Sequence, residues 1–200
     1  MVHPHDNGQI SDEERLMRTA EKLLLEIGLS DITPEMLRQE SGLSEEAFDV
    51  VFDSLEKSGT PALQRLLLRY EERAAEEETI ETQMEAFLSK AMQLMIGNGL
   101  DFIRRWIRDS LNMEQTYGMS IVFTFWDIVG RIFERAIDEG LLIDDTPVKH
   151  LVNTVSAEFF GTVFCWCIMK GTKIEPVHTV CNYCEKDLPV LLEAYLAPVS

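Results

Sequence analysis

The chain has 200 residues, of which 46% are hydrophobic, and it carries a formal net charge of −17. A chain of this length and apolar content can bury a full core, which excludes a disordered protein. Its negative field repels nucleic acid and anionic membranes, so binding to either would need a locally basic patch.

The first sixty residues predict three short helices. Apolar residues recur at spacings of three and four from Asp12 until Gly28, which ends the first helix. The run Thr33-Pro34-Glu35 supplies an N-cap, a proline at the first helical position and an acid for the helix dipole. Ser44 caps the third helix after a tight turn at 42–44. These helices predict a compact head over residues 1–57.

The remaining residues, 58–200, predict a body of longer helices. The expected ranges are 60–70, 80–96, 100–111, 114–139, 146–170 and 177–197, the last with a kink at Pro189. No stretch alternates as a strand does, so the fold class is all-α. No apolar run reaches the length of a membrane span, and the N-terminus has no signal-peptide pattern, which favours a cytoplasmic protein.

The helix expected over 146–170 is apolar on nearly every face. Such a helix must be covered on all sides, which predicts that a second copy of the chain covers one of them. The residues expected at this homodimer interface are Val155, Phe159, Val163, Trp166, Leu188, Leu191, Leu192 and Tyr195.

The chain resembles the TetR family of bacterial one-component regulators over nearly its whole length. The resemblance is carried by the segment from Leu16 to Gly28, by Thr33, by the turn 42–44, and by Phe52, Ser54 and Glu56. Near the other end, GLLIDDTPVKHLVNTVSAEFFGTVF is similar to the family's lead-in to its penultimate helix. The resemblance implies a helix-turn-helix head, an effector pocket, a dimerising helix pair and binding to operator DNA.

The head departs from the family's pattern where DNA would be contacted. The family usually has a polar or basic residue after the turn serine, an aromatic residue with polar or basic neighbours in the middle of the third helix, and a lysine after it. This chain has Glu45, Asp49, Val50, Val51 and Leu55 at these positions. A carboxylate facing a phosphate costs on the order of 1 kcal/mol at partial screening. The candidate DNA-binding residues are Thr33, Ser44, Glu45, Glu46, Asp49 and Ser54.

The aromatic and methionine residues of the body predict either ordinary core or the lining of an apolar cavity. The resemblance favours a cavity for a small apolar effector, with His150, Asn153, Glu158 and Tyr117 as candidate polar anchors. The candidate pocket residues are Met95, Phe102, Trp106, Met113, Phe123, Trp126 and Phe160. The basic cluster of Arg104, Arg105 and Arg108 is expected to pair with nearby carboxylates.

Four cysteines lie near the C-terminus. Cys181 and Cys184 have metal-ligand spacing, and Cys165, Cys167 and His178 are near them in sequence. Because Cys165 and Cys167 point to different faces of a helix, buried thiols are favoured over a zinc site. No set of nucleophile, base and orienting group is found, so neither an enzyme nor a cofactor is expected.

The sequence therefore supports two candidate functions. The first is a homodimeric, effector-responsive transcriptional regulator with weakened or unusual DNA binding. The alternative is a protein of the same fold that no longer binds DNA and acts as an adaptor, coactivator or antirepressor through its acidic head. Such a head would suit a basic protein partner.

Overall fold

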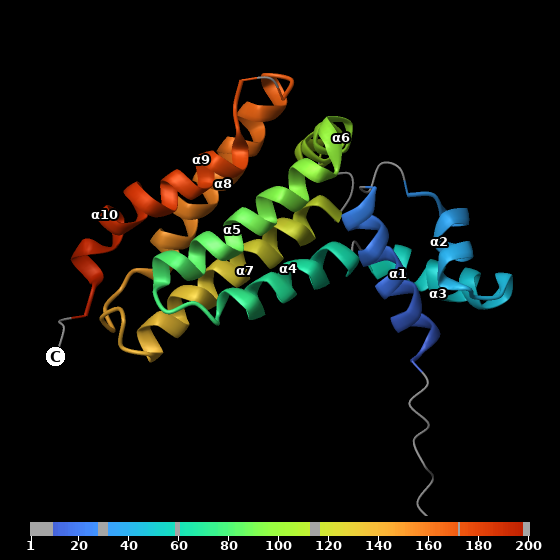
Figure 1. The fold of residues 1–200 in the computed structure, drawn as a ribbon, viewed down its shortest axis with the longest axis horizontal. Helices are drawn as coiled ribbons and strands as arrows, with labels where there is room; N and C mark the ends of the chain where they lie inside the picture. The colour runs from blue at the N-terminus through green and yellow to red at the C-terminus, as the bar shows by residue number, and fades with distance from the viewer. Residues whose placement is uncertain (1–9, 28–31, 59–60, 113–116, 172, 198–200) are drawn as a thin grey trace, which may run out of the picture.

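The computed structural model describes residues 10–27, 32–58, 61–112, 117–171 and 173–197. The head consists of α1 (Asp12–Glu26), α2 (Pro34–Ser41) and α3 (Glu45–Ser58), which lie at one end of the molecule (Figure 1). Its small core is formed by Leu16, Leu43 and Phe48, with Phe48 stacked on Phe52 at a centroid distance of 5.1 Å. The three predicted head helices are thus confirmed.

The body is built from longer helices around α5. Its elements are α4 (Pro61–Ala74), α5 (Ile80–Gly97), α6 (Gly99–Asn112), α7 (Tyr117–Asp138), α8 (Val148–Ile168), α9 (Pro176–Asn182) and α10 (Leu188–Leu192). Helix α5 packs against α4, α6, α7, α8 and α9, and α4 leads from the head along the base of the body (Figure 1). The described residues contain no β-strand, so the predicted all-α class is confirmed.

The last predicted helix is continuous but changes its winding. Between α9 and α10, the segment η2 (Tyr183–Asp187) is π-helical, and the Leu188 N–H donates to the Tyr183 carbonyl. Pro189 has no N–H, and its ring crowds the carbonyl of residue 185, which a regular α-helix would place against it. The wider π-turn removes that conflict. The helix irregularity expected at Pro189 therefore takes the form of a π-turn.

Helix α8 is the one helix of the described chain that is long and apolar enough to cross a membrane, with a mean hydropathy of 1.4. The sequence analysis found no uninterrupted apolar run of this length, because Lys149, Asn153 and Glu158 interrupt it. Helix α8 packs against α5, α6, α7 and α9. These contacts bury 39% of its apolar 18-residue window.

Ion pairs connect α1 of the head to α4 of the body. Glu21 is only 3% exposed, and Arg69 Nη1 lies 2.6 Å from its carboxylate. Arg65 Nε approaches the other oxygen to 3.1 Å, without the alignment of a hydrogen bond. Arg65 also binds Glu14 at 2.9 Å. Hydrogen bonds from Arg65 and then Arg18 lower the pKa of Glu14 from 4.5 to about 2, so this carboxylate stays ionised.

We expect the double substitution Arg65→Met and Arg69→Met to destabilise the chain by about 3 kcal/mol, because it leaves the Glu21 carboxylate buried without a cation. The measurement is the free energy of unfolding from urea denaturation. Adding Glu21→Leu to this double variant should recover most of the loss, since no buried charge then remains. A triple variant as unstable as the double one would contradict this explanation.

Candidate functional site

The turn before α3 has the conformation of a helix-turn-helix. Gly42 adopts a left-handed φ of 64°, which glycine reaches without strain, and it ends α2. Thr33 Oγ1 accepts a hydrogen bond from the Met36 N–H at 3.2 Å, and Ser44 Oγ accepts one from the Ala47 N–H at 3.3 Å. The two hydroxyl groups predicted for DNA contacts therefore cap α2 and α3.

The exposed face of α3 is acidic. Glu45, Glu46 and Asp49 are all exposed, while Phe48, one turn from Ser44, faces the head core. Val50 lies beside Asp49 and is 73% exposed. The structure therefore brings the three predicted acidic residues together on one surface, which we call the α3 face. The side chain of Ser54 lies outside the described residues.

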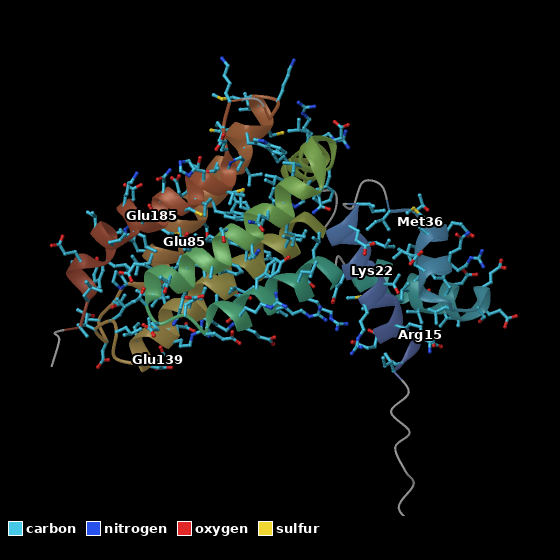
Figure 2. The ribbon with its side chains drawn as sticks, in the orientation of Figure 1. Arg15, Lys22, Met36, Glu85, Glu139 and Glu185 are labelled. Carbon is cyan, nitrogen blue, oxygen red and sulfur yellow. The ribbon has the colours of Figure 1, made fainter. Side chains whose placement is uncertain are left out.

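Three basic side chains of the head, those of Arg18, Lys22 and Arg38, are paired with carboxylates. Arg38 binds Glu35 through Nη2 at 2.6 Å and through Nε at 3.1 Å, and Glu35 is the main cause of its raised pKa. Lys22 lies on α1, on the side facing α2, and its Nζ is 3.3 Å from Glu40 (Figure 2). A phosphate would have to displace these carboxylates to gain a cation.

The predicted pocket residues divide into two groups. Met95 is buried, and Phe102, Trp106 and Phe160 are half-buried against the body core. Phe123 is 50% exposed and Trp126 38% exposed, so both lie on the outer surface of α7. Because α7 is apolar on several faces, the sequence could not distinguish its inner from its outer side. Met113 lies outside the described residues.

The interior is filled by aromatic side chains, only part of which the sequence analysis assigned to a pocket. Phe125 is 4.5 Å from Phe159 and 5.1 Å from Phe160 between ring centroids, and Trp106 is 5.9 Å from Phe160. Phe87 lies 5.5 Å from Phe125. Phe125 and Phe87 are therefore central residues of this cluster that were missed as pocket candidates.

Buried polar atoms occur in the body without a hydrogen-bond partner among the described residues. They include Gln83 Oε1, Ser156 Oγ and Tyr183 Oη. Burial raises the pKa of Tyr183 to about 12, so its hydroxyl group remains protonated. Of the predicted anchors, Glu158 is half-buried, His150 and Asn153 are exposed, and the side chain of Tyr117 lies outside the described part. The polar groups that need a partner are therefore largely different from those predicted.

Most residues predicted for the dimer interface lie inside the chain's own core. Val155, Phe159, Val163, Leu188 and Leu192 are each at most 1% exposed, and Trp166, Leu191 and Tyr195 are partly buried against them. These five side chains already have intramolecular neighbours, so a second copy would have to contact other residues. The uncovered face of α8 presents Asn153, Ala157, Gly161, Phe164 and Ile168 at helical spacing.

The four cysteines are free thiols. Cys165 is exposed, Cys181 is half-buried, and Cys167 and Cys184 are buried. Burial raises the pKa of Cys184 to about 12, and burial followed by Glu85 raises that of Cys181. No group of three side chains in the described ranges could hold a metal ion. In the basic cluster, Arg104 lies 3.5 Å from Asp101.

Comparisons with known proteins identify the fold. No protein-family model matches the chain, and no curated protein is significantly similar in sequence. NemR from E. coli, in its reduced form, is similar in structure with a TM-score of 0.56 and 15% identity, over 95% of this chain and 100% of NemR. A protein of unknown function from Rhodococcus sp. RHA1 gives a TM-score of 0.51 and 17% identity, over 98% of this chain and 100% of that one.

A candidate TetR-family transcription regulator from Shewanella sp. PV-4 aligns with 94% of this chain and 100% of its own, at 12% identity and a TM-score of 0.42. That score is too low to carry weight by itself. The chain is an all-α protein with a helix-turn-helix head, and its fold is TetR-like, as the sequence resemblance implied.

We expect the double substitution Glu45→Lys and Asp49→Lys to raise the affinity for nonspecific duplex DNA at least about tenfold, because each removes a repulsion and adds a phosphate contact. Fluorescence anisotropy with a labelled duplex at low salt measures the change. The control is Glu76→Lys with Glu77→Lys, which changes the net charge equally at exposed residues between α4 and α5. Equal gains in both variants would show that the α3 face has no special role.

Proposed function

We propose that the chain is a homodimeric, effector-responsive transcriptional regulator of the TetR type with weak DNA affinity. The observation that supports this proposal is the position of α4, which forms ion pairs both with α1 of the head and with α7 of the body. Beyond the Arg65 and Arg69 pairs, Glu71 near the end of α4 accepts hydrogen bonds from Arg131 of α7, with Nε 2.9 Å from Oε1. Glu71 is 8% exposed, so its carboxylate is largely screened from water, whereas the Arg131 side chain is 44% exposed.

A displacement of α7 would therefore be transmitted to the head. Helix α7 contributes Phe125 to the interior aromatic cluster and Arg131 to the pair with α4. A small apolar effector that separates these rings would move α7, and α4 would carry the movement to α1. Effector binding at the interior site would thus be coupled to the spacing of the two heads in the dimer, and the coupling free energy would set the strength of the regulation.

The effector should be mainly apolar with few polar groups. The rings around Phe125 offer an apolar surface, and the unpartnered atoms of Gln83, Ser156 and Tyr183 supply polar groups for orientation. Each of these atoms is buried at a free-energy cost unless a ligand or a water molecule binds it.

The second copy should pack on the uncovered face of α8. Phe164 is 49% exposed and Ile168 is 60% exposed, one turn apart, and they follow Ala157 and Gly161 on the same face. Small residues allow two helices to approach closely, and the large apolar residues supply area to bury. The interface proposed here is thus formed by exposed residues of α8, in place of the buried side chains that were expected from the sequence.

We expect Ile168→Glu to convert the dimer to a monomer at micromolar concentration, because the carboxylate would be buried without a partner. Sedimentation velocity measures the mass. Leu68→Glu is the matched control, since Leu68 is a 40% exposed leucine on α4. A wild-type chain that sediments as a monomer would overturn the homodimer, and an Ile168→Glu variant that stays dimeric would overturn this face.

The regulator function is tested with the DNA that precedes the chain's own coding sequence. We expect a weak complex at low salt, and its affinity should fall as salt is added. For each phosphate that the protein contacts, log K should fall by about 0.9 when the salt concentration rises tenfold. A mobility-shift titration measures both quantities. If no shift appears at micromolar protein and low salt, the chain alone is not a DNA-binding regulator.

The acidic α3 face favours a second candidate function, in which the head binds a basic protein segment instead of DNA. Exposed Val50 would give such a partner an apolar contact among the carboxylates of Glu45, Glu46 and Asp49. The same mobility shift separates the two candidates, because an adaptor would leave DNA unbound at low salt.

A further inference from the structure

A surface groove of about 550 Å3 lies between α7 and the first turns of α8. Gly130 of α7 and Val148 and Val152 of α8 form its apolar part. Trp126 lies one turn before Gly130 in the same wall, and its side chain is 38% exposed. The volume is in the range of pockets that take small organic molecules.

Gly130 keeps this groove wide at a cost to the helix. It lies in the middle of α7, where glycine destabilises a helix by about 1 kcal/mol relative to alanine. A Cβ atom at this position would lie 3.8 Å from Val152 Cγ2, which is an ordinary van der Waals contact. Packing therefore does not require a glycine here, and its effect is to leave space beside Val152.

The charged residues around the groove leave an excess of carboxylates. Asp127, Arg131 and Glu134 follow each other on α7 at helical spacing, and all three line the groove. Arg131 is already bound by Glu71. Neither Asp127 nor Glu134 forms an ion pair within the part of the chain that the structure describes. Lys149 of α8 is the cation left to balance them, so one negative charge remains in excess.

An apolar floor, an exposed indole ring and one carboxylate in excess of the available cations are features that favour an organic cation. A cation over the face of tryptophan gains about 0.5–2 kcal/mol, depending on its desolvation. The net charge of −17 adds a long-range attraction for cations and disfavours anions. We propose that this groove binds a small organic cation, with the charged group near Asp127 and Glu134 and the apolar part against Trp126 and Val152.

The groove is separate from the interior aromatic cluster, and the tryptophans report on each independently. Trp106 packs on Phe160 in the interior, whereas Trp126 lines the groove. The chain contains three tryptophans, so three indole N–H signals are expected in a 1H–15N spectrum. Single Trp→Phe variants assign them. The groove proposal can therefore fail while the interior effector site stands, and the reverse also holds.

The test is a titration of the full chain with benzyltriethylammonium chloride at constant ionic strength. We expect a saturable shift of the Trp126 indole signal, while benzyl alcohol and sodium benzoate at the same concentrations produce none. A saturable shift at Trp106 alone, or equal shifts with the neutral and anionic compounds, overturns the proposal. No shift at the Trp126 signal also overturns it.

Two variants locate the site. Gly130→Leu fills the groove, and Asp127→Asn with Glu134→Gln removes its free carboxylates; each should weaken binding of the probe about tenfold or more. The pair Glu76→Gln with Glu77→Gln is the control, and it should bind as the wild type does. Unchanged binding in the neutralised double variant overturns the proposal, and this variant alters only exposed side chains, so it tests the groove even if Gly130→Leu does not fold.

Discussion

The buried carboxylate of Glu21 is the constraint on which the arrangement of head and body depends. An ionised group with 3% exposure is tolerated only when cations compensate for its lost hydration. The cations, Arg65 and Arg69, come from α4, so α1 can keep its place only while α4 lies alongside it. Glu71 of the same helix is also a largely buried carboxylate, with Arg131 of α7 as its partner. Helix α4 is thus joined by ion pairs to α1 of the head and to α7 of the body.

The acidic composition acts differently in the two parts of the chain. At the contact between α1 and α4, carboxylates are matched by arginines and contribute to the fold. On the α3 face they are left exposed, and the nearby Arg38 is already held by Glu35. Local pairing thus leaves an acidic surface where a helix-turn-helix protein would approach phosphates.

Much of the fold could be predicted because its signals are local. The capping residues Thr33 and Ser44, the left-handed Gly42 and the spacing of apolar residues each act within a few positions, and the structure bears them out. The faces of α7 and α8 could not be predicted in the same way. Helix α8 is apolar around most of its circumference and residues 117–126 of α7 carry no charged side chain, so which side meets the core there depends on neighbours far away in sequence. For this reason Val155 and Phe159 were expected at an interface, and Trp126 was expected in the interior.

The π-turn before Pro189 determines which side chains of the following helix face the core. One extra residue in a helical turn rotates everything after it by about 100° relative to an unbroken α-helix. This rotation places Leu188 and Leu192 in the core, where both are fully buried, and leaves Val190 at 70% exposure. The proline that interrupts the backbone hydrogen bonds is therefore also the reason that the C-terminal residues close the core. Regular α-winding of the same residues 183–187 would turn those leucines away from the core by about 100°.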